Sequence, residues 1–302
     1  MISFVNAKIN IGLQIVSRRE DGYHNLQTIF YPVGVYAGTP ENPDSFCDII
    51  EIEGRNITQS GCRDRFTLHL SGRMIDCERE KNLVFRAARM YFDSLSQVSF
   101  GADIYLDKYL PDGAGMGGGS ADAAFTLKML RDVHCRFAQD GNVPDDDELA
   151  EMAVRLGADC PFFLMNRPAY ATGIGEILQP VDIDLSGCWL LVVKPVVSVS
   201  TKEAFAGIVP RKARFDLREL PSLKLEDWKD VVANDFEPGI FANHPELAEI
   251  KQRLYAAGAA YASMTGSGSC IYGIFRSKEI ATRARNSFAS NPTISNIYLL
   301  KM

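Results

Sequence analysis

The sequence has 302 residues, of which 46% are hydrophobic and 23% charged, and it carries a formal net charge of −6. This composition predicts a globular protein of one large or about two domains, and it excludes disordered, collagen-like and repeat architectures. The net charge disfavours bulk binding of nucleic acid or anionic lipid, and every apolar run is far shorter than the ~20 residues of a membrane span. No signal peptide is visible, so we expect a cytoplasmic protein without nucleic-acid or membrane partners.

The chain has seven scattered cysteines and no Cys-x-x-Cys pair. Cys47, Cys62 and Cys77 are evenly spaced, and His69 is the only histidine near them. These four side chains could form a metal site, but free thiols in a reducing cytosol are the favoured interpretation.

The N-terminal part alternates apolar and polar residues from Asn6 to Ile15, which predicts a half-buried strand with Lys8 and Asn10 on one face. Asp21-Gly22 then predicts a tight turn, followed by a second strand that reaches Phe30. The elements expected next, in chain order, are a loop over 37–43, strands over 47–53 and 66–71, a helix over 82–95 and a strand over 102–106.

Two helices are expected after a glycine-rich stretch, over 121–133 and over 145–156. The first is apolar on most faces and should be buried, while Gly157 should end the second. The rest of the chain predicts the order strand, helix, strand, strand, helix, strand, which is that of a ferredoxin-like layer. These elements are expected over 189–194, 246–257, 259–264, 269–275, 278–290 and 294–300. The predicted fold class is therefore α+β, with helices covering antiparallel sheet in each half.

The stretch from Pro111 to Ser120 holds five glycines between positions 113 and 119, directly before a predicted helix. Glycine loses more backbone entropy on folding than other residues, and close approach of backbone N–H groups to a ligand would compensate for this loss. A helix N-terminus adds unpaired N–H donors and about half a positive charge, so the stretch suits a polyphosphate. A plain strand-to-helix connection is the alternative.

Two familiar nucleotide-binding patterns do not fit this stretch. It contains Gly-x-Gly-x-x-Gly at Gly113, Gly115 and Gly118, but no strand ending in an acidic residue follows about 20 positions later, as a dinucleotide site requires. No Gly-Lys-Ser/Thr closes it, so it is not a Walker loop. The residues therefore support phosphate binding and leave the class of nucleotide site open.

Four motifs resemble those of the GHMP kinases, the small-molecule kinases named for galactose, homoserine, mevalonate and phosphomevalonate. The motifs are AKINIGL at 7–13 with DGYH at 21–24, PDGAGMGGGSADAA at 111–124, LGADCPFF at 156–163 and MTGSGS at 264–269. The first and third are similar to the kinases of 4-diphosphocytidyl-2-C-methyl-D-erythritol in particular. The resemblance covers nearly the whole chain.

The resemblance implies a two-domain GHMP kinase fold, with an S5-domain-2-like, ATP-binding half over 1–158 and a ferredoxin-like half over 159–302. It also implies ATP-dependent phosphorylation, with Mg²⁺, of the 2-hydroxyl of this cytidine-diphosphate-linked methylerythritol, in non-mevalonate isoprenoid precursor synthesis. The alternatives are a kinase of mevalonate, homoserine or a sugar, and a non-enzymatic nucleotide-binding protein on the same fold. We expect a monomer or a homodimer.

Catalysis is assigned by the resemblance to Asp159, as the base for the hydroxyl, and to Lys8, whose ammonium would favour the ionised carboxylate. Asp159 lies amid apolar residues, where a lone carboxylate costs free energy unless it is paired or functional. From the residues alone, Asp159 is equally well interpreted as a helix N-cap ahead of Pro161, and Lys8 as part of a solvated strand face. Whether Asp159 removes the proton or orients the hydroxyl is open at this point.

For the substrate, the resemblance implies that Tyr23 and Phe205 stack on the two faces of the cytosine and that His24 meets its polar edge. An exposed hairpin tip and a core aromatic are the plain interpretations of these rings. The other implied substrate contacts are Asn10, Gly266, Ser267 and Gly268.

The implied ATP loop comprises Pro111, Asp112, Gly113, Ala114, Gly115, Met116, Gly117, Gly118, Gly119, Ser120 and Ala121. Ser120 is expected to cap the following helix and to reach a Mg²⁺ ion, which needs few protein ligands because it keeps waters and phosphate oxygens.

Overall fold

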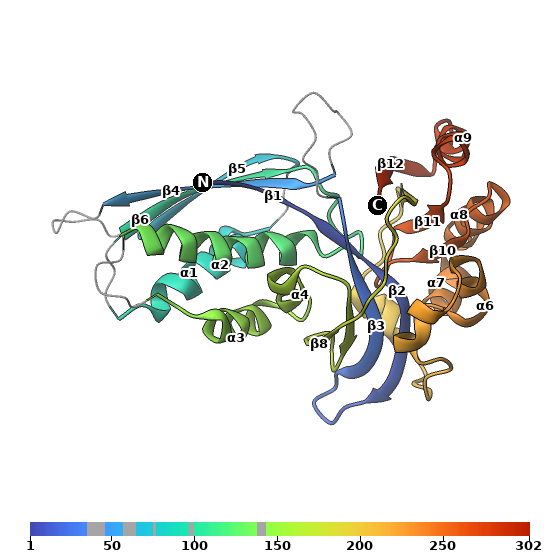
Figure 1. Cartoon of the computed structure of the whole chain (residues 1–302), viewed down its shortest axis with the longest axis horizontal. Helices are drawn as coiled ribbons and strands as arrows, with labels where there is room; N and C mark the ends of the chain where they lie inside the picture. The colour runs from blue at the N-terminus through green and yellow to red at the C-terminus, as the bar shows by residue number, and fades with distance from the viewer. Residues whose placement is uncertain (35–45, 57–64, 75–76, 97–99, 138–142) are drawn as a thin grey trace.

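The computed structural model describes residues 1–34, 46–56, 65–74, 77–96, 100–137 and 143–302. A long hairpin of β2 (Ala7–Arg18) and β3 (His24–Val33) runs between the two halves of the molecule, as Figure 1 shows. One half carries α1 (Leu83–Ser94), α2 (Gly118–Phe137) and α3 (Asp146–Leu156), and the other carries the elements from β9 to the C-terminus. Residues on the hairpin can therefore meet residues from both halves.

The N-terminal half contains a four-stranded sheet that α2 covers. Its strands are, in spatial order, β1 (Ile2–Val5), β4 (Asp48–Asn56), β6 (Phe100–Lys108) and β5 (Phe66–Gly72), with β5 and β6 parallel and the other neighbours antiparallel. α2 packs against β4 and against both α1 and α3, and it buries Ala123, Leu127 and Leu130 among others. The prediction of a buried helix here is confirmed.

The residues just before α1 and α3 cap the N-termini of these helices. The Asn82 side chain accepts a hydrogen bond from the N–H of Val84 at 2.8 Å, and Asp145 forms a capping box with Glu148. α2, however, begins at Gly118, three residues before the predicted start. The helical hydrogen bonds begin at Gly117, whose oxygen accepts the N–H of Ala121 at 2.8 Å. Ser120 therefore lies in the first turn, and its predicted position as the helix cap is wrong.

The hairpin corrects one prediction about burial. Lys8 and Asn10 are only 3% and 2% exposed, so β2 is buried on both faces instead of one. The cause is that both faces are covered. On the side of Lys8 and Asn10, Lys8 Nζ lies 3.3 Å from Asp159 and Asn10 bonds to Thr28 and Thr265. On the other side, β11 (Ile271–Phe275) packs against Ile9 and Ile11. The hairpin sheet continues through β7 (Ala169–Thr172) and β8 (Ile177–Pro180), which were not predicted.

The C-terminal half contains a sheet in the order β10 (Tyr261–Met264), β11, β9 (Trp189–Pro195) and β12 (Ile294–Lys301), with antiparallel neighbours throughout. α8 (Pro245–Ala256) and α9 (Lys278–Phe288) pack against this sheet. The predicted ferredoxin-like layer is thus confirmed. The short helices that were not predicted are α4 (Cys160–Met165), α5 (Thr201–Ala206), α6 (Trp228–Val231), α7 (Glu237–Asn243) and the 3-10 turns Arg79–Lys81, Leu217–Ser222 and Leu225–Asp227.

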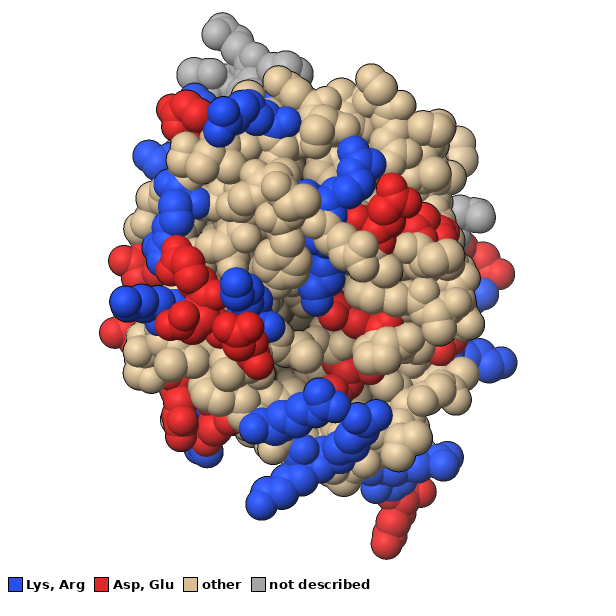
Figure 2. Space-filling view, turned by 90° about the vertical axis from the view of Figure 1, so that its right-hand side faces the viewer, with Lys and Arg blue, Asp and Glu red and all other residues tan. Residues whose placement is uncertain are grey.

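On the face of the C-terminal half that Figure 2 shows, Lys and Arg side chains gather along the lower edge and mix with acidic ones elsewhere. None of the helices in the described part of the chain combines the length and apolarity that a membrane crossing needs. The predicted boundary between residues 158 and 159 falls between α3 and α4, and the hairpin sheet takes strands from either side of it. That boundary stays a prediction.

Candidate active site

A cavity of about 380 Å³ lies where the hairpin, α4, α5 and two glycine-rich loops meet. We call residues 111–120 the phosphate loop and residues 265–268 the second glycine loop. The predicted site residues that line this cavity are Lys8, Asn10, Tyr23, His24, Gly113, Gly115, Gly117, Asp159, Phe205, Gly266, Ser267 and Gly268. The other predicted residues of the ATP loop, including Ser120 and Ala121, are not part of this lining. The fold therefore brings together residues that are up to 260 positions apart.

The phosphate loop is fixed against the hairpin by its backbone. The main-chain N–H of Lys8 donates to the oxygen of Met116 at 2.9 Å. At Gly115, φ is +71°, and a Cβ atom would lie 2.1 Å from the main-chain oxygen of Thr265, so only glycine fits there. The loop then enters α2, whose first N–H groups form the positive end of a 20-residue helix. This arrangement suits an anion.

Thr265 joins the two glycine loops to the strand that carries Lys8. Its hydroxyl donates to the oxygen of Gly115 at 3.1 Å, and it accepts the N–H of Asn10 at 3.1 Å. Thr265 was not predicted as a site residue, although a hydroxyl residue within a glycine motif was a visible signal. These two bonds fix the positions of both glycine loops relative to β2.

Lys8 and Asp159 form the charged centre of the cavity. The Lys8 Nζ atom is 3.3 Å from Asp159 Oδ2, donates to Asn10 Oδ1 at 2.7 Å, and lies 4.7 Å from the centre of the Phe30 ring. Asp159 stands at the N-cap position of α4, but its side chain makes no capping hydrogen bond within the described chain. Its carboxylate is 32% exposed and lines the cavity beside Lys8. A cap and a solvated strand face, the two plain interpretations, therefore do not describe these residues.

Three rings form what we call the aromatic wall of the cavity: His24, Phe205 and Phe236. The His24 and Phe205 rings are stacked, with centroids 4.9 Å apart, and Phe236 meets Phe205 edge-on at 4.8 Å. Tyr23, at the hairpin tip, is 61% exposed and also lines the cavity. The sequence analysis missed Phe236. The stacking of Tyr23 and Phe205 on a base stays a prediction.

Comparison with known proteins identifies the family. Residues 82–167 match the model of the GHMP kinases N terminal domain, and residues 213–293 match that of the GHMP kinases C terminal domain. A 4-diphosphocytidyl-2-C-methyl-D-erythritol kinase of Bacteroides fragilis is 43% identical over 284 residues, which cover 94% of this chain and 95% of that protein. That of Bacteroides thetaiotaomicron is 42% identical over 275 residues, with 91% and 92% covered.

The chain belongs to the 4-diphosphocytidyl-2-C-methyl-D-erythritol kinase family.

Solved structures agree with this assignment. A crystal structure of 4-(cytidine 5'-diphospho)-2C-methyl-D-erythritol kinase superposes with a TM-score of 0.78 at 30% identity, covering 99% of this chain and 98% of that one. A homoserine kinase from Cytophaga hutchinsonii has a TM-score of 0.66 at 18% identity, covering 99% and 95%, and shows the fold alone. The predicted GHMP kinase fold is confirmed, and the alternative of a non-enzymatic protein is not favoured.

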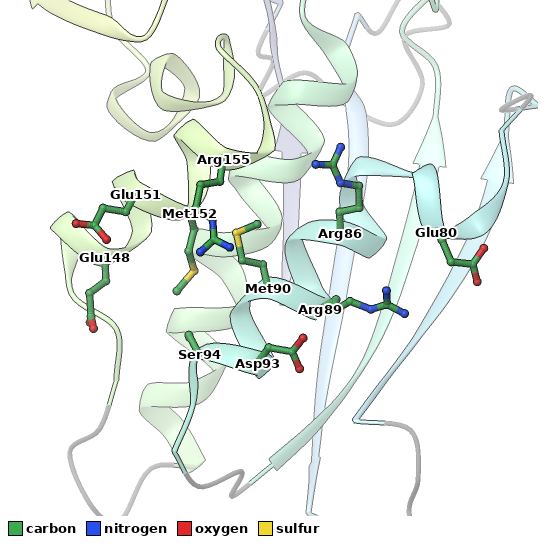
Figure 3. Close-up of a pocket in the computed structure, with 10 residues that line it drawn as sticks. All are labelled: Glu80, Arg86, Arg89, Met90, Asp93, Ser94, Glu148, Glu151, Met152 and Arg155. Atoms are coloured by element: carbon green, nitrogen blue, oxygen red, sulfur yellow. The ribbon is translucent and has the colours of Figure 1, made fainter.

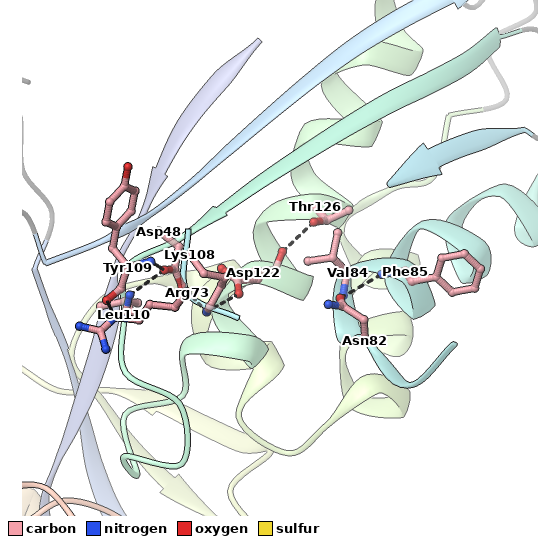
Figure 4. Close-up of polar contacts among 10 residues, drawn as sticks. All are labelled: Asp48, Arg73, Asn82, Val84, Phe85, Lys108, Tyr109, Leu110, Asp122 and Thr126. Carbon is pink, nitrogen blue, oxygen red and sulfur yellow. Dashed lines mark hydrogen bonds and ion pairs between the residues drawn. The ribbon is translucent and has the colours of Figure 1, made fainter. Parts of the chain in front are cut away.

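A buried ion cluster of Asp48, Lys108 and Asp122 holds the phosphate loop of this kinase at both ends (Figure 4). Asp48 Oδ1 accepts the N–H groups of Tyr109 and Leu110 at 2.7 and 2.8 Å, just before the loop. Lys108 Nζ bonds to Asp48 and, at 2.8 Å, to Asp122 in the second turn of α2, just after the loop. This cluster was not predicted, because no sequence pattern places residues 48, 108 and 122 together.

Burial dominates the electrostatics of this cluster, in which each side chain is at most 3% exposed. It raises the pKa of Asp122 to about 8, against the attraction of the Lys108 ammonium. Burial alone would lower the pKa of Lys108, but the two carboxylates outweigh it, so that pKa is raised. Burial thus favours the protonated form of Asp122, and the two carboxylates favour the charged form of Lys108.

A second cavity of this kinase, about 590 Å³, lies between α1 and α3 (Figure 3). It is lined by charged side chains of both signs, with Met90, Ser94 and Met152 between them: Glu80, Arg86, Arg89, Asp93, Glu148, Glu151 and Arg155. No glycine lines it among the described residues. Although it is larger, it lacks the groups that phosphoryl transfer needs, and the smaller cavity is the candidate active site.

The structure also locates the residues considered for metals. Among the described residues, no three His, Cys, Asp or Glu side chains come together as a metal site. Cys47 is a buried free thiol and Cys77 an exposed one, while Cys62 lies outside the described residues. Ser120 adjoins Cys160, whose thiol pKa is raised to about 12 by burial. The proposed contact of Ser120 with Mg²⁺ stays a prediction.

Proposed function

We propose that this kinase transfers the γ-phosphoryl group of ATP to the 2-hydroxyl of 4-diphosphocytidyl-2-C-methyl-D-erythritol, in non-mevalonate isoprenoid precursor synthesis. The proposal rests on one observation: the Lys8–Asp159 pair and both glycine loops line the same cavity. The names of relatives above 40% identity supply the substrate.

The phosphate loop binds the triphosphate in this proposal. Its backbone N–H groups and the positive end of α2 offset the negative charge without the entropic cost of ordering long side chains. Phosphoryl transfer depends mostly on positioning and on charge stabilisation, so a rigid loop tied to β2 and to Thr265 suits it.

Asp159 accepts the proton of the attacking hydroxyl. As the O–P bond to the γ-phosphorus forms, the bond from that phosphorus to the β-phosphate oxygen breaks, and ADP leaves. The Lys8 ammonium, 3.3 Å from the Asp159 carboxylate, stabilises the hydroxyl oxygen as negative charge develops. Asn10 holds the Lys8 ammonium in place through its Oδ1 atom.

Mg²⁺ would be held mainly by the phosphates of ATP, with the hydroxyl of Ser120 as a protein ligand in the first turn of α2. An oxygen donor at this position fits a hard cation, which takes few protein ligands when substrate phosphates supply the rest. The ion would neutralise charge on the phosphates. ATP itself is expected for every kinase of this family.

The aromatic wall and Tyr23 select the acceptor. Base–aromatic stacking contributes about 1–3 kcal/mol per base, and a cytosine between Tyr23 and Phe205 would gain it on two faces. His24, which now stacks on Phe205, would then meet the polar edge of the base. Mevalonate, homoserine and simple sugars have no base that could use these rings, which favours the cytidine-linked acceptor.

The test is an ADP-release assay with Mg-ATP and a set of acceptor alcohols. We expect turnover of 4-diphosphocytidyl-2-C-methyl-D-erythritol and none above background with free methylerythritol, mevalonate or homoserine. Equal turnover with and without the cytidine diphosphate group would remove the base-binding part of the proposal. Turnover of mevalonate or homoserine alone would overturn the proposal itself.

A further inference from the structure

A short segment, residues 233–237, lies beside β2 at the edge of the active-site cavity. The N–H of Leu13 donates to the oxygen of Ala233 at 2.9 Å, and the N–H of Asp235 donates back to the oxygen of Leu13 at 2.8 Å. The Asp235 carboxylate also accepts the N–H of Ile15 at 2.8 Å. These bonds anchor the segment on the same strand that carries Lys8.

Within this segment, the side-chain amide of Asn234 is 1% exposed and makes three hydrogen bonds. Its Nδ2 atom donates to the main-chain oxygens of Met264 and Gly266 at 2.9 and 2.8 Å. Its Oδ1 atom accepts the N–H of Phe236 at 3.0 Å. Three of the four bonds that an asparagine side chain can make are thus used, so its orientation is fixed.

The two oxygens held by Asn234 flank Thr265. Since both neighbouring peptide groups are fixed, Thr265 is held where its hydroxyl meets Gly115 of the phosphate loop and the N–H of Asn10 on β2. The amide of Asn234 therefore determines how the second glycine loop sits against the ATP side of the cavity and against the strand of Lys8.

The third bond acts on the acceptor side. Phe236, whose N–H is held by Asn234, lines the cavity and contacts Phe205 edge-on at 4.8 Å. Asn234 itself is not part of the cavity lining. One buried amide thus fixes the second glycine loop and one ring of the aromatic wall.

We propose that Asn234 is a positioning residue for phosphoryl transfer, which aligns the ATP side and the acceptor side of the active site with each other. The proposal for the acceptor side rests on the proposed function. An asparagine is needed because no other small side chain offers two donors and one acceptor in one plane. An aspartate would face two buried carbonyl oxygens without a hydrogen to donate, and glutamine is longer by a methylene group.

The experiment compares Asn234→Asp and Asn234→Ser with the wild-type enzyme, measuring kcat, both KM values and the melting temperature. A misplacement of about 1 Å can cost about 10² in rate, so we expect kcat of Asn234→Asp to fall at least roughly tenfold. The KM values should rise by less than kcat falls. Asn234→Ser, which keeps one donor, should give an intermediate kcat, and it carries the test if Asn234→Asp does not fold.

The matched control is Tyr255→Phe, which removes the hydrogen bond from Tyr255 to the oxygen of Ala262 on β10, away from the cavity. It should lower the melting temperature and leave kcat within about twofold of wild type. Wild-type kcat in a folded Asn234 variant, or an equal fall in kcat for Tyr255→Phe, would overturn the inference. Failure of the proposed function would appear separately, as a wild-type enzyme that does not turn over the cytidine-linked acceptor.

Discussion

In the described part of the chain, a buried lysine meets carboxylates in two clusters, and these differ in solvent access. In the active-site cavity, Lys8 faces Asp159, whose carboxylate is 32% exposed and 3.3 Å away. In the buried ion cluster, Lys108 bonds to both Asp48 and Asp122, and no side chain is more than 3% exposed. The exposed carboxylate of Asp159 can bind a substrate, whereas the groups of the buried ion cluster can only bind each other and their neighbours.

This difference indicates what separates a reactive ion pair from a structural one. A carboxylate at the rim of a cavity keeps acceptor positions for a hydroxyl, and Asp159 has no capping bond to lose within the described chain. The carboxylate of Asp48, by contrast, accepts from Lys108, Tyr109 and Leu110. We therefore expect substitutions in the first cluster to change turnover and substitutions in the second to change stability.

The largest expected effect is that of Asp159→Asn. Without a carboxylate to accept the proton, kcat should fall by about 10²–10⁴-fold, while ATP binding, measured by calorimetry with a nonhydrolysable analogue, should stay near wild type. Asp184→Asn, at an exposed position outside the cavity, serves as the control and should leave kcat unchanged. Near-normal turnover of Asp159→Asn would exclude Asp159 as the base.

Lys108→Met tests whether the buried ion cluster contributes to stability. Removing the ammonium leaves two carboxylates buried without their cation, and breaking such a buried pair typically costs about 3–5 kcal/mol. We expect this loss in the free energy of unfolding, measured by urea denaturation.

The matched variant is Lys8→Met, which should lose most of its turnover while its free energy of unfolding changes by less than that of Lys108→Met. If both variants lost the same stability and the same activity, the distinction between a reactive and a structural cluster would fail.

The sequence predicted the elements of the fold better than their burial. The alternation in β2 and the order of elements from β9 to β12 were visible because each depends on a local period. The burial of Lys8 and Asn10 was not, since it depends on Asp159 and Thr265, which lie about 150 and 255 residues further along the chain. β7 and β8 were missed because strands of four residues carry little pattern.

In the candidate site, too, the residues marked by a local property were predictable and those that depend on distant contacts were not. The glycines of the phosphate loop were predictable, because their backbone freedom is a property of the residue itself. The resemblance supplied Lys8, Asp159 and Phe205, which the pattern alone left ambiguous. Thr265 was missed although it stands within a glycine motif. Asn234 was missed because its importance lies in which main-chain oxygens it contacts, and only the folded chain determines that.

The smallest expected effect concerns the pH dependence of stability. Burial raises the pKa of Asp122 to about 8 in the folded protein, against an ordinary value of 3.8. Between these values the unfolded chain releases this proton and the folded protein keeps it, so Asp122 destabilises the fold increasingly as pH rises from about 4 to about 8. Asp122→Asn removes this dependence. Its free energy of unfolding, relative to wild type, should therefore rise by about 1 kcal/mol or more between pH 5 and pH 8, as urea denaturation at each pH can measure. A difference that stays constant over this range would mean that the pKa of Asp122 is not raised in the folded protein.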